Sequence, residues 1–136
     1  MAASVIVDAS FLITLLSRRE GNHAWAESQA RTFPPPWQTC EAALSESFHL
    51  LGRAGAPALQ QLIRREAIAV SFPFQEAADS VLRLMHKYAD VPMSFADACL
   101  VRMTETLPEP TLLTTDADFR IYRRFGRRTI PCVMPQ

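Results

Sequence analysis

Four acidic residues stand at positions where a carboxylate is costly unless something cationic holds it. Asp8 and Asp116 each end an apolar run of the kind that forms a buried strand. Glu46 and Asp97 lie in mainly apolar stretches with helical spacing. Two unit charges about 4 Å apart interact by roughly 4 kcal/mol at an effective dielectric of 20. If the fold brings these carboxylates together, they must take up protons, accept hydrogen bonds or bind a cation.

Carboxylate oxygens are hard ligands and select Mg²⁺ or Mn²⁺ rather than zinc. The four acids therefore predict a divalent metal site. Other roles remain open for single residues: Asp8 can cap a helix, and Asp97 can be an acid favoured by a helix dipole. Glu41 is a rival for Glu46. The three cysteines and three histidines include no pair with the spacing of a zinc finger.

The elements that must position these acids alternate between strands and helices. Apolar runs rich in β-branched residues and helical periodicity distinguish the two kinds of element. The expected strands are 4–8, 37–40, 68–72, 111–115 and 129–133. The expected helices are 11–16, 22–31, 41–53, 58–66, 76–88 and 95–107, with a short helical turn at 119–123. This alternation predicts an α/β sandwich with a mostly parallel central sheet of four to five strands flanked by helices.

Such a sheet explains how residues far apart in the sequence can meet. In open α/β sheets, functional groups gather at the carboxyl ends of the strands. Asp8 and Asp116 share that edge if their strands are parallel neighbours. Glu46 and Asp97 lie near the starts of their helices, and helix starts in this architecture face the same edge.

Length and composition are those of one ordinary globular domain spanning 1–136, with 49% hydrophobic and 21% charged residues. No apolar stretch approaches the roughly 18 residues that a bilayer requires, and the N-terminus does not resemble a signal peptide. Three widely spaced cysteines suit reduced thiols. We therefore expect a cytoplasmic protein with no membrane partner.

The net charge is zero, but its distribution is uneven. No acid follows Asp118, whereas five arginines do. These side chains can bind RNA phosphates or form a solvated face, and the sequence leaves both interpretations open. The candidates for RNA contact are Arg120, Arg123 and Arg124.

The local contexts of the acids resemble, in order, those of the PIN-domain ribonucleases, and most closely the VapC-type toxins of type II toxin–antitoxin systems. The resemblance covers essentially the whole chain. It consists of an initial hydrophobic strand ending in Asp, a Glu inside the third helix, an Asp-Ala opening a late helix, and Thr-x-Asp-x-Asp-Phe near the end. In this sequence these are Val7-Asp8-Ala9-Ser10, Leu44-Ser45-Glu46, Phe95-Ala96-Asp97-Ala98 and Thr114-Thr115-Asp116-Ala117-Asp118-Phe119.

This resemblance implies a PIN-like three-layer sandwich and a metal-dependent ribonuclease. Asp8, Glu46, Asp97 and Asp116 would hold one or two Mg²⁺ or Mn²⁺ ions, which activate water for hydrolysis of an RNA phosphodiester. Ser10 and Thr114 match the family's hydroxyl positions and would orient carboxylates or water, and Asp118 would be an outer ligand or a cap. The implied partners are RNA, a cognate antitoxin and a second copy of the chain.

Three alternatives remain beside a toxin. A housekeeping RNA-processing PIN nuclease would carry the same residues. A catalytically silent module that binds RNA or protein is disfavoured because all four acids are present. A phospho-acceptor receiver domain needs a lysine after a late strand, and Lys87, the only lysine, does not lie there.

Overall fold

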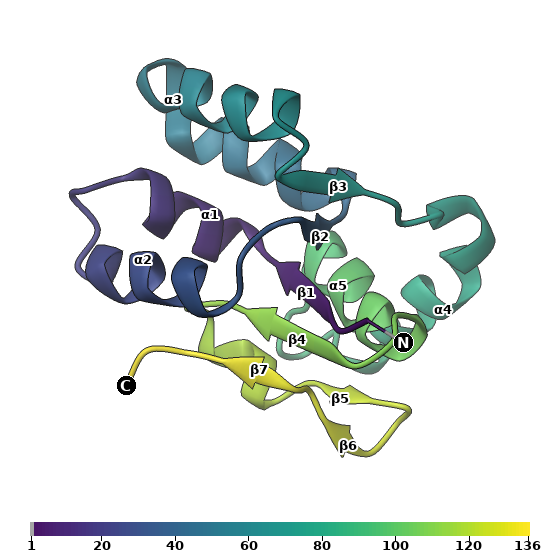
Figure 1. The fold of residues 1–136 in the computed structure, drawn as a ribbon. Coiled ribbons are helices and arrows are strands. Elements are labelled where there is room, and N and C mark those ends of the chain that lie inside the picture. Colours follow the sequence, from purple (N-terminus) through teal and green to yellow (C-terminus); the bar gives the residue numbers. More distant parts are fainter. Residues whose placement is uncertain (1) are drawn as a thin grey trace.

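The computed structural model describes residues 2–136, built around a sheet of five parallel strands (Figure 1). The strand order β3-β2-β1-β4-β7 places β1 in the centre, with Ile6 opposite Gln38 on one side and Leu112 on the other. The predicted parallel α/β sheet is therefore confirmed. The strands are β1 (Ser4–Val7), β2 (Trp37–Thr39), β3 (Ile68–Val70), β4 (Pro110–Leu113) and β7 (Cys132–Val133).

Helices cover both faces of the sheet. Five α-helices and one 3₁₀ helix, η1, form from residues 2–136, and none of them is long and apolar enough to cross a membrane. Helix α1 packs against α2 and α3, whereas α4 packs against α5. The bounds are α1 (Ala9–Leu16), α2 (His23–Thr32), α3 (Glu41–Arg64), α4 (Phe74–Lys87), α5 (Phe95–Thr106) and η1 (Ala117–Arg120).

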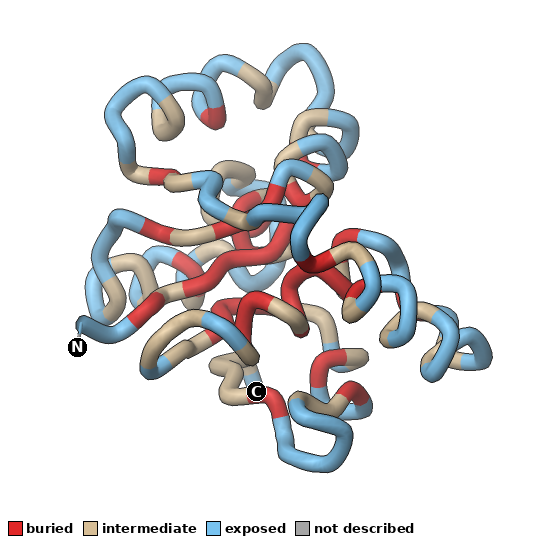
Figure 2. The backbone as a smooth tube through the Cα atoms, turned by 90° about the vertical axis from the view of Figure 1, so that its right-hand side faces the viewer, coloured by how far each residue is buried: buried red, intermediate tan, exposed pale blue. Residues whose placement is uncertain are grey.

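Side-chain alternation along the strands divides the interior into two cores. Successive strand residues point to opposite faces, so Ile6 and Val7 enter different cores. Ile6 packs with residues of α4 and α5, including Val81 and Leu100. Val7 packs with residues of α1 and α2, including Phe11. The result is the expected three-layer sandwich, in which many of the buried residues lie along the central strands (Figure 2).

The end of the chain differs from the expected strand at 129–133. Strand β6 (Arg128–Thr129) pairs with β5 (Arg123–Arg124) in an antiparallel hairpin, and only β7 joins the central sheet. Pro131 separates β6 from β7 and has no N–H for a sheet hydrogen bond. The hairpin turn is formed by Phe125 and Gly126, whose φ angles are 52° and 83°. The helical turn expected at 119–123 lies slightly earlier, as η1.

Helix α3 also differs, because the two helices expected at 41–53 and 58–66 form one element with a break at Gly52. Gly52 has φ 67° and ψ −168°, a backbone conformation open essentially only to glycine. The break changes the direction of α3 between the part that carries Glu46 and the part that ends at Arg64.

Replacing Gly52 by alanine should destabilise the protein by about 1–3 kcal/mol, because a Cβ atom strains this backbone conformation even though no atom lies within 4 Å of it. Gly21→Ala is the matched control, since Gly21 has equally open surroundings without a positive φ, and should change stability by less than about 0.5 kcal/mol. Urea unfolding followed by circular dichroism measures both. Equal stabilities of the two variants would contradict the strain at Gly52.

Candidate functional site

Asp8 lies at the carboxyl end of β1 and is only 4% exposed. Its Oδ1 atom accepts hydrogen bonds of 2.9 Å from the Phe11 backbone N–H and 2.7 Å from the Ser10 hydroxyl. The bond from Phe11 makes Asp8 the N-cap of α1, so the capping interpretation is correct for this oxygen. The Oδ2 atom accepts a short hydrogen bond from the Thr114 hydroxyl. One carboxylate thus joins the ends of β1 and β4 to the start of α1.

Two hydroxyl groups extend this network along the edge of the sheet. The Oγ atoms of Ser10 and Thr114 lie 3.1 Å apart. Ser10 Oγ accepts a 2.9 Å hydrogen bond from the Thr115 N–H, and Thr114 Oγ1 accepts one of 2.9 Å from the Asp116 N–H. The hydroxyls therefore fix the backbone that leads into Asp116.

Asp116 and Asp8 lie at the same edge because β1 and β4 are parallel neighbours in register, with Val7 opposite Leu113. Asp116 Oδ1 accepts a 2.9 Å hydrogen bond from the Asp118 N–H, and this bond begins η1. Asp116 and Asp118 are both half-buried.

Asp97 occupies the first turn of α5 and is half-buried. The Ser94 hydroxyl caps the helix by accepting a 3.0 Å hydrogen bond from the Asp97 N–H. Asp97 Oδ2 accepts a 2.9 Å hydrogen bond from the hydroxyl of Tyr122, which is fully buried. This carboxylate is therefore held by a tyrosine from a segment that follows η1.

Glu46 is exposed on α3, while its neighbours Leu44 and Phe48 pack against the core. It lies between two pockets. One, of about 340 Å³, is also lined by Ser10 and Thr115. The other, of about 560 Å³, is lined by residues at the start of α5 and by others from α3. Glu46 thus shares one pocket with Ser10, which binds Asp8, and the other with Ser94, which caps the helix that carries Asp97.

The charges of these acids affect one another. Burial raises the pKa of Asp8 to about 6, although the hydrogen bonds that Asp8 accepts lower it. The negative charge of Asp97 adds to the increase. Burial also raises the pKa of Asp97 to about 6, opposed by the hydrogen bond from Tyr122 and reinforced by the charges of Asp116 and Glu46. Asp97 therefore lies near enough to Asp8, Asp116 and Glu46 for its charge to interact with theirs.

The donor set suits a divalent ion. It consists of carboxylates and hydroxyls, the hard oxygen ligands that Mg²⁺ and Mn²⁺ prefer. Within residues 2–136, no lysine or arginine forms an ion pair with any of the four acids, so their charge is left for another cation. In the same part of the chain, no three His, Cys, Asp or Glu side chains are grouped tightly enough to hold an ion directly.

The structure gives the candidate arginines different roles. Arg123 donates to three backbone carbonyls, those of residues 120, 121 and 122. Arg124 donates to the Thr104 carbonyl and lies over the Phe125 ring. Arg120 is exposed on η1, four residues after Asp116 in the sequence.

Two residues of this site are absent from the set found in the sequence. Tyr122 contacts Asp97 through its hydroxyl, and Ser94 caps the helix that carries Asp97. Ser94 had a signal, because a serine directly before a helix and three residues before an acid is a common capping pattern. Tyr122 had none, because its contact depends on how the chain turns after η1.

Comparison with known proteins identifies the family to which this parallel α/β domain belongs. The model of the PIN domain family matches residues 5–124, so the chain belongs to the PIN-domain family. The crystal structure of VapC20 from Mycobacterium tuberculosis, described as a sarcin–ricin loop cleaving toxin, matches this fold with a TM-score of 0.76 and 22% identity. The match covers 92% of this chain and 99% of VapC20. A search of curated protein sequences found no match.

The raised pKa of Asp8 makes stability depend on pH in the metal-free protein. The folded state holds a proton on Asp8 up to about pH 6, whereas the pKa of an unperturbed aspartate is 3.8. The folded state therefore binds more protons between these values, and stability falls as pH rises through that window. The shift corresponds to a loss on the order of 3 kcal/mol.

We expect the protein in EDTA to unfold at a higher temperature at pH 5 than at pH 7, and Asp8→Asn to reduce this difference. Glu41→Gln, which removes an exposed acid, should retain the wild-type difference. Differential scanning calorimetry at the two pH values measures it. The same pH difference in Asp8→Asn and wild type would contradict the assignment to Asp8.

Proposed function

We propose that this chain is a single-domain, metal-dependent ribonuclease of PIN type that hydrolyses RNA phosphodiester bonds. The observation that carries the proposal is the set of four acids, Asp8, Glu46, Asp97 and Asp116, in which the charge of Asp97 interacts with those of the other three. Among residues 2–136, no lysine or arginine side chain is paired with any of them. Such a group has little use in a structural domain, since bringing like charges together and partly burying them costs free energy.

The chain's own residues prepare the site. Thr114 and Ser10 hold both oxygens of Asp8, and Thr114 also fixes the amide of Asp116. Tyr122 holds one oxygen of Asp97. Mg²⁺ or Mn²⁺ held among these acids, directly or through bound water, would activate a water molecule and stabilise the charge that develops on the phosphate.

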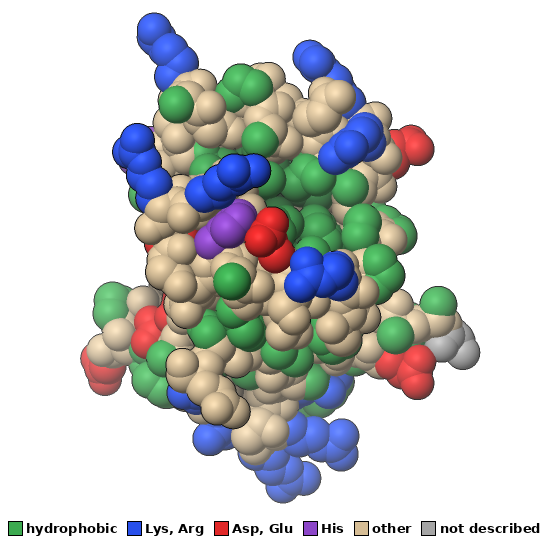
Figure 3. All heavy atoms as spheres, turned by 60° about the vertical axis from the view of Figure 1, so that its left-hand side comes forward, with side chains coloured by type: hydrophobic (Ala, Val, Ile, Leu, Met, Phe, Trp, Pro, Cys, Tyr) green, Lys and Arg blue, Asp and Glu red, His purple; other side chains and the backbone are tan. Residues whose placement is uncertain are grey.

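Substrate RNA would enter the region between α3 and the sheet edge, where the two pockets flank Glu46. Arg120 is the best placed of the three candidate arginines to contact a phosphate, because it is exposed, whereas the side chains of Arg123 and Arg124 are half-buried and bound to backbone carbonyls. Arg123 and Arg124 contribute through the segment that they stabilise. Arg127 and Arg128 are exposed on the hairpin of β5 and β6. Figure 3 shows basic side chains gathered at the lower end of the molecule.

A toxin restrained by an antitoxin is the biological role that we propose, with a cytoplasmic location and a homodimeric state. Its support is the PIN family match and the fold shared with VapC20. The exposed Leu50 and the exposed pair Phe74 and Phe95 offer apolar surface for a protein partner. A housekeeping PIN nuclease would have the same site, so the two roles differ in partner and substrate.

The first test is cleavage of a mixed RNA pool that includes a sarcin–ricin loop oligonucleotide, with Mn²⁺, with Mg²⁺ and with EDTA. Glu46→Gln and Asp97→Asn should each reduce cleavage at least about 100-fold, because losing a residue that only supports a ligand already costs 10–100-fold. Glu41→Gln is the matched control on the same helix and should retain wild-type activity.

Cleavage that survives EDTA or Asp97→Asn would contradict a metal-dependent site at these acids. Loss of activity in Glu41→Gln but not in Glu46→Gln would exchange the roles of the two glutamates. Tight Mn²⁺ binding without cleavage of any RNA would favour the silent binding module.

Arg120→Ala should weaken RNA binding about equally for all sequences and reduce the slope of log affinity against log salt by about 1, because a phosphate contact releases about one counterion. Arg65→Ala is the control, since Arg65 is an exposed cation at the end of α3. Fluorescence anisotropy with labelled RNA in EDTA at several salt concentrations measures both. An unchanged salt slope for Arg120→Ala would remove Arg120 from the RNA site.

A further inference from the structure

Tyr122 is among the largest fully buried side chains of the protein, with 0% exposure. A buried tyrosine hydroxyl usually needs a hydrogen-bond partner. Here the partner is Asp97 Oδ2, at 2.9 Å. Burial and the nearby charge of Asp97 raise the pKa of Tyr122, so the hydroxyl keeps its proton and acts as the donor.

Aromatic neighbours fix the ring of Tyr122. Tyr88 packs against it with centroids 5.2 Å apart and planes at 65°, and Phe119 packs at 5.3 Å and 90°. Tyr88 comes from the end of α4 and Phe119 from η1. A ring held from two elements points its hydroxyl in one direction.

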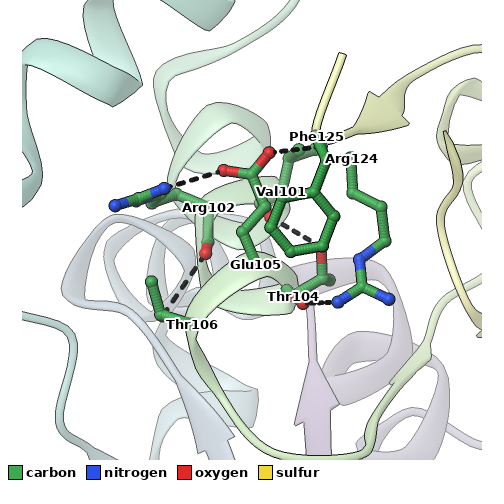
Figure 4. Close-up of polar contacts among 7 residues, drawn as sticks. All are labelled: Val101, Arg102, Thr104, Glu105, Thr106, Arg124 and Phe125. Atoms are coloured by element: carbon green, nitrogen blue, oxygen red, sulfur yellow. Dashed lines mark hydrogen bonds and ion pairs between the residues drawn. The ribbon is translucent and has the colours of Figure 1, made fainter. Parts of the chain in front are cut away.

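The segment from Tyr122 to Phe125 is fastened along α5 at a second place. Figure 4 shows this contact: the Phe125 N–H donates a 2.7 Å hydrogen bond to Glu105, whose other oxygen accepts one of 3.1 Å from Arg102. Arg124 donates to the Thr104 carbonyl nearby.

Thr104 and Glu105 follow Asp97 by about two helical turns and therefore lie on the same side of α5. The segment runs along that side, anchored at Asp97 by its first residue and at Glu105 by its last. Its two attachments fix the position of Tyr122 along the helix.

We propose that Tyr122 is a positioning residue for the metal site: its hydroxyl holds Asp97 Oδ2 and leaves Oδ1 as the oxygen that binds the ion. This inference rests on the proposed function. A neutral hydroxyl suits the role because it orients the carboxylate without supplying a positive charge that would compete with the ion. Partners of this kind orient metal ligands, and their loss typically lowers metal affinity 10–100-fold.

The test is Mn²⁺ binding by isothermal titration calorimetry to wild type, Tyr122→Phe, Tyr88→Phe and Asp97→Asn. Tyr122→Phe should bind Mn²⁺ about 10–100-fold more weakly than wild type. Tyr88→Phe is the matched control, because it removes a hydroxyl from the neighbouring ring that accepts the Arg123 N–H and touches no site acid. It should change the affinity less than twofold, and thermal unfolding in EDTA compares the folding of the two variants.

The rescue variant Tyr122→4-aminophenylalanine returns an N–H donor to the same ring position and should recover most of the wild-type affinity. It also carries the test if Tyr122→Phe does not fold. A folded Tyr122→Phe protein that binds Mn²⁺ as tightly as wild type would overturn the role of Tyr122. A folded rescue variant that binds Mn²⁺ as weakly as Asp97→Asn would also overturn it.

Failure of the proposed function gives a different result. Wild-type protein that binds no Mn²⁺, or Asp97→Asn that binds it as tightly as wild type, would refute the metal site itself. Loss of binding in Asp97→Asn together with unchanged binding in Tyr122→Phe would refute only the positioning by Tyr122.

Discussion

Negative charge that is removed from water at one edge of the sheet is the constraint on which this structure depends. Asp8 and Asp97 are both desolvated, and each feels the charge of another acid. A parallel sheet makes this crowding unavoidable, because it brings the ends of β1 and β4 to the same edge. The starts of α1 and α5 lie there too, and the positive ends of helix dipoles partly offset the negative charge.

The offsetting groups close to the acids are neutral donors. Ser10, Thr114 and the Phe11 amide bind Asp8, and Tyr122 binds Asp97. Such donors lower the cost of a carboxylate without cancelling its charge, so the edge keeps a negative potential. Arg124 of the hairpin lies toward the other end of α5, where it donates to the Thr104 carbonyl instead of neutralising the acids.

Much of this arrangement could be predicted from the sequence. The strands ending at Asp8 and Asp116 follow from contiguous apolar residues, and the parallel sheet follows from the alternation of strands and helices. The hairpin could not be predicted, because Phe125 adopts a positive φ that its residue type disfavours and that its bond to Glu105 supports. Tyr122 was missed because its contact with Asp97 depends on how the chain turns after η1. The exposure of Glu46 could not be predicted either, because Leu44 and Phe48, two residues away on either side, are apolar.

The break at Gly52 has a mechanical consequence for Glu46. An unbroken helix with the 24 residues of α3 would be a rigid rod about 36 Å long. Any displacement of its far end, such as one caused by a partner molecule or by a substitution near Leu59, would tilt the whole rod and carry Glu46 with it. The break at Gly52, after the first three turns, limits how far such a displacement passes along α3. The part of α3 that carries Glu46 therefore moves less when the rest of α3 is displaced.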